Sequence, residues 1–213
     1  MTDLALYDPD CRRCPRLAAF RDEVKDRHPD YWCRPVPAFG DPAPRIVLVG
    51  LAPGLHGANR TGRPFTGDYA GILLYETLFA LGLASQPQSV AADDPLRLAG
   101  LRISNAVKCL PPANKPNPDE IARCNAFLKA ELRVLSSVRV LVALGRIAHD
   151  AALDALGIRR AAARFGHGAE HRLDDGRWLL DSYHCSRYNT NTRRLTPEMF
   201  RAVLARAVEL AAP

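Results

Sequence analysis

GLAPGLHGANRTGRPFTGDYAG, residues 50–71, is the most informative stretch of this 213-residue chain. It follows the apolar run 45–49, which predicts a buried strand, and a helix-like pattern begins at Ile72. The stretch is therefore expected to be a glycine-rich loop at the carboxyl end of a strand, where open α/β sheets bind ligands. An ordinary solvated loop is the alternative, but loops of this length are usually functional or disordered. The side chains on offer are His56, Asn59, Arg60, Arg63, Phe65, Thr66 and Asp68.

Strand patterns and helix patterns alternate along the rest of the chain. Helices are expected from Pro15 to just before Pro29, at 72–83, at 118–136, at 146–156 and from Pro197 onward. Apolar runs predict strands at 45–51, 101–107, 138–144 and 178–183. This alternation predicts a single domain, residues 1–213, of the α/β class. We expect three α/β/α layers around a central four-stranded parallel sheet, with polar loops converging at the carboxyl ends of its strands.

Composition and charge restrict the class of protein. The chain has 47% hydrophobic and 24% charged residues, as globular domains do. It has no apolar run of the roughly 20 residues that span a membrane, and residues 1–11 lack a signal-peptide pattern, so a cytoplasmic protein is expected. The net charge of +6 suits a polyanion, although an arginine bias from a GC-rich genome would give the same balance. The chain has no P-loop motif, which disfavours a nucleotide triphosphatase.

Six cysteines without a secretion signal favour metal binding or buried thiols over disulfides. Four thiolates can bind a tetrahedral zinc ion or an iron–sulfur cluster, and a C-x-x-C pair can also be a redox centre. The two candidates later in the chain could instead be small buried hydrophobes. The spacing favours metal binding without choosing the metal. The candidate ligands are Cys11, Cys14, Cys109 and Cys124, with Cys33 and Cys185 left over.

Two polar residues stand out as candidates for chemistry. His184 leaves the strand at 178–183 and could donate a hydrogen bond to a developing anion, although a lone histidine is often structural. Asp68 could stabilise a cationic sugar or position a water molecule, but it could equally cap the helix that follows it. The loop after His184 adds Arg187, Tyr188 and Arg193. These residues could hold phosphates and push a wedge into a duplex, or form an ordinary solvated basic loop.

Residues 50–68 resemble the first motif of the type-b, or fifth-family, prokaryotic uracil-DNA glycosylases. The loop His184-x-Ser186-x-x-Asn189-x-x-Thr192 resembles their second motif, and the likeness extends over about residues 11–197. The resemblance implies a four-stranded parallel sheet of the uracil-DNA glycosylase type. It also implies a DNA-repair hydrolase that removes uracil and other deaminated bases, such as hypoxanthine and xanthine, from DNA. The four candidate cysteines match the ligands of the family's [4Fe–4S] cluster.

The resemblance also implies a role for individual residues. Asp68 matches the catalytic aspartate and Asn114 a second catalytic residue, while His184 lies near O2 of the base. Phe65 matches the aromatic residue that stacks on the flipped base. Asn105 occupies the place of the base-reading asparagine of a sister family, which is a departure from type b. The remaining base-binding candidates are Gly54, His56 and Ser186, and the DNA-binding candidates are Arg60, Arg63, Arg187, Tyr188, Asn189 and Arg193.

The mechanism expected from these residues is hydrolysis of the N-glycosidic bond after the base is flipped out of the duplex. No lysine is obviously placed to form a Schiff base, so we expect a monofunctional enzyme that acts as a monomer on duplex or single-stranded DNA. One alternative is a non-catalytic nucleic-acid-binding module with a structural iron–sulfur or zinc site. Another is a cysteine-ligated electron-transfer protein, which would have no use for the Phe65, Asp68 and His184 loops.

Overall fold

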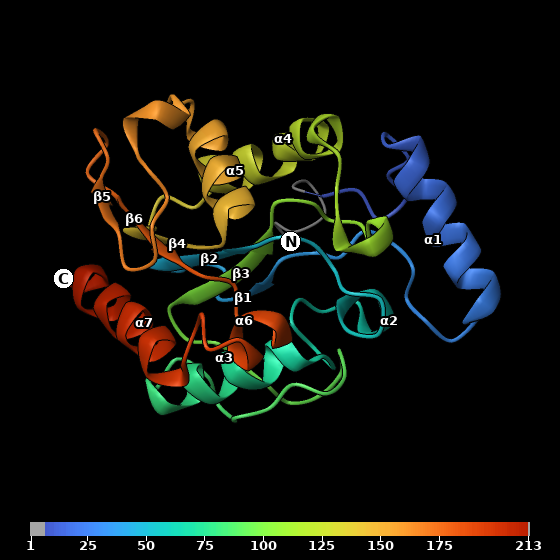
Figure 1. Cartoon of the computed structure of the whole chain (residues 1–213), viewed down its shortest axis with the longest axis horizontal. Helices are drawn as coiled ribbons and strands as arrows, with labels where there is room; N and C mark the ends of the chain where they lie inside the picture. Colours follow the sequence, from blue (N-terminus) through green and yellow to red (C-terminus); the bar gives the residue numbers. More distant parts are fainter. Residues whose placement is uncertain (1–6, 213) are drawn as a thin grey trace.

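Six strands form one sheet in a computed structural model that describes residues 7–212 (Figure 1). The strand order is β1-β3-β2-β4-β6-β5. The four inner strands are parallel, as expected, and the two short edge strands are antiparallel to their neighbours. The strands are β1 Phe39–Gly40, β2 Ile46–Gly50, β3 Leu101–Asn105, β4 Val140–Leu144, β5 Glu170–Arg172 and β6 Trp178–Ser182. The predicted four-stranded parallel core is thus confirmed and extended by one short strand at each edge.

Helices cover both faces of the sheet, which gives the three expected layers (Figure 1). Alternation along β2 separates the two cores: Ile46 and Leu48 pack with α3 and α7, whereas Val47 and Val49 pack with α4 and α5. The long helices are α1 Pro15–Arg27, α3 Tyr69–Ala80, α4 Pro118–Val134, α5 Arg146–Leu156 and α7 Pro197–Ala211. No helix within residues 7–212 has the length and apolar character required to cross a bilayer. The expected lack of a signal peptide concerns in part residues 1–6, which lie outside the described residues.

Local capping explains where the helices begin. Asn117 and Glu120 form the predicted capping box at the start of α4, and Thr196 caps α7. Helix α3 begins at Tyr69, three residues before the predicted start, because the side chain of Asp68 accepts a hydrogen bond from the Gly71 amide. Two loops also contain short helices that the sequence did not indicate, α2 Ala58–Thr61 and α6 Arg187–Asn191.

A buried polar network joins the strand β6 to the helix α5 and the edge strand β5. Nδ1 of His149 lies 2.7 Å from Asp181 Oδ1, and its Nε2 lies 3.1 Å from the carbonyl oxygen of Ala163. Both ring nitrogens therefore face acceptors, which requires the imidazolium form. His171 contacts the second carboxylate oxygen of Asp181 at 3.2 Å. Burial disfavours the charge on His149, but the hydrogen bond and charge of Asp181 outweigh it and raise the His149 pKa.

We predict that Asp181→Asn lowers the free energy of unfolding by about 3 kcal/mol, because breaking a buried ion pair strands the other charge. A folded-state pKa raised above 6.5 means that the stabilisation is complete below pH 6.5 and is lost as the pH rises through the raised value. Urea unfolding of the two proteins between pH 6 and 9 measures both effects. Asp154→Asn, which breaks a solvent-exposed pair with Arg160 near the end of α5, is the matched control and should cost well under about 1 kcal/mol. Equal losses in the two variants would contradict the prediction.

Candidate active site

A cleft of about 680 Å³ opens at the carboxyl ends of all four parallel strands. The loop after β2 forms one wall, the end of β3 and Asn114 contribute another part, and the segments after β4 and β6 close the remainder. The chain leaves β2 toward β3 on one side and leaves the neighbouring strand β4 toward β6 on the other side, so the connections from β2 and β4 diverge at this edge of the sheet. This is the crevice in which open α/β sheets bind ligands, as the sequence predicted.

Asp68 lies in the cleft and also caps α3, so capping the helix does not remove its side chain from the cleft. Its Oδ1 accepts a hydrogen bond of 3.0 Å from the Gly71 amide. Its Oδ2 faces Gly54 and Gly57, and a Cβ atom on Gly57 would collide with the carboxylate. Burial raises the pKa of Asp68, and the hydrogen bonds from the Gly71 and Ala70 amides only partly offset this effect.

The rings of Phe65 and His184 face one another across the cleft. Their centroids are 5.8 Å apart and their planes differ by 27°. Phe65 has a φ of +54°, a conformation that costs energy in a bulky residue. The neighbouring Pro64 carbonyl accepts a 2.8 Å hydrogen bond from the buried Tyr75 hydroxyl, which helps to hold this turn. The Phe65 ring therefore faces the cleft from a strained backbone, which the hydrogen bond from Tyr75 holds in place.

Asn105 ends β3 and is paired in register with Gly50 of β2. It lines the cleft, is 3% exposed, and its Oδ1 is buried without a hydrogen-bond partner among residues 7–212. A Cβ atom on Gly50 would collide with this oxygen and would also lie 2.8 Å from the Phe65 ring. The amide and the ring therefore approach the same point from two sides. A buried acceptor without a partner is costly, so this site favours a ligand that donates a hydrogen bond.

His184 is held by its backbone while its ring is left free. The carbonyl oxygen of His184 accepts a 2.8 Å hydrogen bond from the side-chain amide of Asn189. Its imidazole makes no hydrogen bond within residues 7–212. Burial lowers the pKa of His184 to about 4, so the ring is neutral near pH 7 and keeps one N–H to donate.

The predicted catalytic residue Asn114 also lines the cleft, as do the remaining predicted base-binding residues, Gly54, His56 and Ser186. His56 is exposed at the rim, where its Nδ1 lies 2.9 Å from the hydroxyl of Tyr31. Asn114 ends a short 3₁₀ turn with a φ of +55°, and its side chain is exposed. The structure thus gathers all of the predicted catalytic and base-binding residues at one place.

The residues predicted to contact DNA are distributed differently. Arg187 lies at the cleft, and Arg60, Tyr188 and Arg193 are exposed, Tyr188 with 71% of its surface. Asn189 is partly buried and serves the loop of His184.

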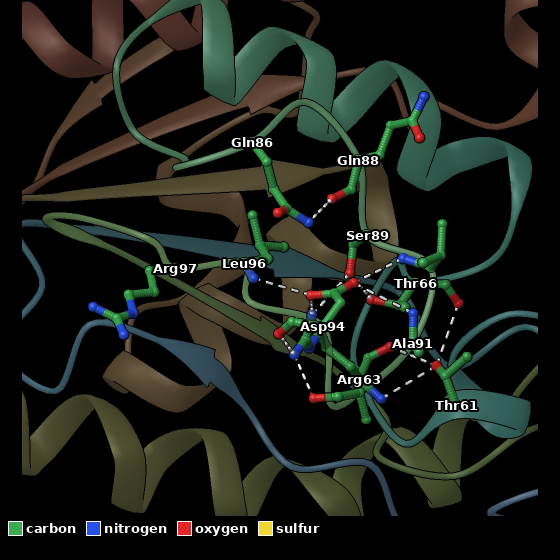
Figure 2. A network of polar contacts seen from close by, with 12 residues as sticks. Thr61, Arg63, Thr66, Gln86, Gln88, Ser89, Ala91, Asp94, Leu96 and Arg97 are labelled. Carbon is green, nitrogen blue, oxygen red and sulfur yellow. Dashed lines mark hydrogen bonds and ion pairs between the residues drawn. The ribbon is translucent and has the colours of Figure 1, made fainter.

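The predicted contact of Arg63 with DNA is contradicted by the structure, because Arg63 is buried and its guanidinium points into the protein (Figure 2). It forms an ion pair with Asp94, donates a 3.1 Å hydrogen bond to Ser89 Oγ and lies 4.3 Å from the ring centroid of Phe39. Its physical role is to fasten the loop 84–100 to the glycine-rich loop.

The four candidate metal ligands come together from distant parts of the chain. Cys11, Cys14, Cys109 and Cys124 line one small cavity beside α1. Burial and the neighbouring thiols raise the pKa of Cys109 to about 12. Tetrahedral zinc would hold its sulfurs roughly 3.8 Å apart. Within residues 7–212, three potential ligand atoms lie within 4.8 Å of one another at His149, His171 and Asp181, but no three of the four cysteine sulfurs come as close as this. The cysteine set is wider than a zinc site and suits a larger cluster.

Arg21 provides an independent test of that fit. Its guanidinium is 4% exposed and donates one 2.9 Å hydrogen bond, to the carbonyl oxygen of Cys11. Its Nε and Nη1 atoms are buried without a partner among residues 7–212. The Arg21 charge acts on Cys109 and lowers the pKa of that thiol, against the larger effect of burial. A buried cation needs a counter-charge, and thiolates bound to iron would supply it.

Some residues of the cleft were not singled out from the sequence. They are Leu55, Tyr69, Ala70 and the segment 144–147 at the start of α5. Gly145 ends the strand β4 as expected, and this glycine could have indicated that the segment 144–147 lines the cleft. Nothing in the local pattern marked Tyr69, because its partners lie in the α6 loop.

Comparisons with known proteins find relatives over most of the chain. The model of the uracil DNA glycosylase superfamily matches residues 37–207. The chain is 55% identical to a type-5 uracil-DNA glycosylase of Thermus thermophilus over 94% of each chain. It is 46% identical to the type-5 enzyme of Mycobacterium tuberculosis, over 94% of this chain and 78% of the relative. A type-4 uracil-DNA glycosylase of Pyrobaculum aerophilum is 35% identical over 70% of this chain and 62% of its own.

We predict that the His184 imidazole titrates near pH 4 in the folded protein, because burial disfavours its charged form. The ring carbon and nitrogen shifts in NMR spectra, assigned with His184→Gln, should stay those of neutral imidazole down to about pH 5, well below the ordinary value near 6.5. The lowered pKa also means that burying neutral His184 contributes to the free energy of unfolding in a pH-dependent way. This contribution is complete above pH 6.5 and is lost as the pH falls toward 4. Titration near pH 6.5 would contradict the burial of this ring.

Proposed function

Since this chain belongs to the uracil DNA glycosylase superfamily, we propose that it removes uracil from DNA by hydrolysing the N-glycosidic bond. The observation that carries the proposal is the unpartnered Asn105 oxygen in the cleft beside the ring of Phe65. The pairing edge of uracil offers an N–H between two carbonyl oxygens. The Asn105 amide can accept from that N–H and donate to one oxygen, while His184 can donate to the other. With the Asn105 oxygen directed at the ring nitrogen, cytosine would place an acceptor against that oxygen and its amino group against the Asn105 amino group, so neither hydrogen bond could form.

The chemistry divides between Asp68 and His184. As the bond between sugar and base lengthens, positive charge develops on the sugar and negative charge on the base. The Asp68 carboxylate stabilises the first charge, and Asn114 guides the attacking water. Neutral His184 donates to O2 of the leaving base, and a preorganised donor of this kind contributes about 3 kcal/mol. A neutral donor does not have to give up a proton, so the base leaves as an anion.

DNA binding uses the exposed residues around the cleft. The target base must leave the stack before it can reach Asp68. Arg187 and Tyr188 on α6 fill the space that it vacates, and Arg60 and Arg193 contact phosphates. Action as a monomer remains part of the proposal. We keep the single domain of residues 1–213 and a cytoplasmic location as predictions.

Other deaminated bases form a second part of the proposal. Hypoxanthine and xanthine each present a ring N–H beside a carbonyl oxygen, the same pattern that Asn105 would read in uracil. The cleft volume of about 680 Å³ is ample for a purine. We therefore propose that both bases are substrates as well.

A [4Fe–4S] cluster held by Cys11, Cys14, Cys109 and Cys124 completes the proposal. The support is the shared cavity, the wide spacing of the sulfurs and the unpaired guanidinium of Arg21. When bound, the cluster would cross-link the start of α1 to the segment between β3 and α4. Its contribution is to stability and to the position of the loop that ends in Asn114, and no step of the reaction passes through it.

We predict that Asp68→Asn lowers the single-turnover rate of uracil release by about 10²- to 10⁴-fold, because the amide cannot stabilise the cationic sugar. Fluorescence anisotropy should show retained binding to uracil-containing duplex. The pKa of Asp68 is raised, so the wild-type rate should fall as the pH drops through a value above 3.8.

The control for this experiment is Asp93→Asn, which removes the same charge from an exposed loop and should leave the rate unchanged. If Asp68→Asn retained the full rate, the assignment of the carboxylate would be wrong. If the wild-type protein bound uracil-containing DNA but released no base, the chain would be a binding module.

We predict that Cys109→Ser loses the iron and the broad visible absorption of the native protein, which should carry about four iron atoms per chain. The reason is the loss of one ligand from a cluster that needs four. Cys33→Ser is the matched control, because Cys33 is equally buried but contacts Asn59 instead of the other cysteines. Iron analysis and visible spectra measure the outcome. Equal iron content in both variants would remove Cys109 from the ligand set.

A further inference from the structure

Helix α6 carries the exposed residues proposed to enter the duplex, and it lies beside the start of α3 (Figure 1). Thr190 Oγ1 lies 3.2 Å from the hydroxyl of Tyr69, and one hydroxyl donates to the other. The same Thr190 oxygen lies 3.2 Å from the Ser186 carbonyl oxygen and 3.1 Å from that of Arg187. The guanidinium of Arg187 lies 5.0 Å from the centre of the Tyr69 ring. Within residues 7–212, the hydrogen bonds and ring contacts that join residues 187–191 to anything outside their own loop are the two with Tyr69.

Tyr69 connects this helix to the candidate catalytic carboxylate. It follows Asp68 directly and is the first residue of α3. It is partly buried and its side chain lines the cleft. Tyr69 therefore lies between two parts of the proposed site: the carboxylate that acts on the sugar and the helix that enters the duplex.

We propose that Tyr69 is a positioning residue that holds α6 over the cleft, so that Arg187 and Tyr188 meet the duplex in the correct orientation. The inference rests on the proposed function. The physical argument is one of preorganisation, since a helix of five residues has little stability of its own. A helix held in place before DNA arrives loses less conformational freedom when the duplex is opened.

The role predicts a dependence on the DNA substrate. Tyr69 assists only the opening of the duplex, so its loss should matter most where the base is hardest to extrude. Uracil paired with adenine is harder to extrude than uracil mismatched with guanine, and a single strand requires no extrusion. A residue that shaped the cleft itself would affect all three substrates equally.

The test is single-turnover excision by Tyr69→Phe on these three substrates. The variant keeps the ring beneath Arg187 and loses only the hydroxyl. The loss of one hydrogen bond predicts a rate about five- to tenfold lower for uracil opposite adenine, a smaller loss opposite guanine and no loss on a single strand. Thr190→Val removes the same contact together with the Thr190 contacts to the Ser186 and Arg187 carbonyls, so its loss should be at least as large and show the same order of substrates. The double variant should be no worse than Thr190→Val, because Tyr69→Phe then has no further contact to break.

The matched control is Thr77→Val on the same helix, whose hydroxyl donates to the Leu73 carbonyl at 2.7 Å and does not reach α6. Its rates should equal those of the wild type on every substrate. An equal loss by Tyr69→Phe on uracil opposite adenine and opposite guanine would overturn the proposal, as would unchanged rates on both. Failure of the wild-type protein to release uracil from any substrate would instead overturn the proposed function.

Discussion

Two residues without side chains make the cleft possible. Gly50 ends the central strand β2, and the space that its side chain would occupy is filled by the Asn105 amide and the Phe65 ring. Gly57 leaves the same kind of space for the carboxylate of Asp68. Both glycines lie in the stretch 50–71, whose loop must fold back tightly on the strand that precedes it. The proposed roles of Asn105 in reading the base and of Asp68 in its release depend on this close approach.

The same burial acts in opposite directions on the two ionisable groups of the cleft. It raises the pKa of Asp68 and lowers the pKa of His184, since each charged form loses contact with water. For His184, burial alone favours the neutral form that can donate a hydrogen bond. For Asp68, burial works against the charged form, and the amides of Gly71 and Ala70 at the start of α3 oppose that effect.

Much of the fold could be predicted because its signals are local. Apolar runs mark the four parallel strands, and the capping box of Asn117 marks the start of α4. The edge strands β1 and β5 span only two and three residues, too few to show a period. Contacts distant in sequence were also beyond reach. Arg63 looked like a DNA ligand because its partner Asp94 lies 31 residues away, and burial depends on that partner. The convergence of the loops at one edge of the sheet could be expected from the α/β alternation. Which of their side chains act together, Asp68, Phe65, Asn105 and His184, could be expected only from a resemblance to known enzymes.

The order of the strands along the chain determines the order in which the residues of the cleft are synthesised. Asp68 and Phe65 follow β2, the first parallel strand to leave the ribosome, whereas His184 follows β6, the last. Folding during synthesis begins with the N-terminal part of a chain. A nascent chain that ends before β6 holds the carboxylate and the amide, but the outer edge of β4 is unpaired and no imidazole faces Phe65. The protein can therefore hold a flipped base between both groups only when translation is nearly complete, and a prematurely terminated product lacks half of the apparatus.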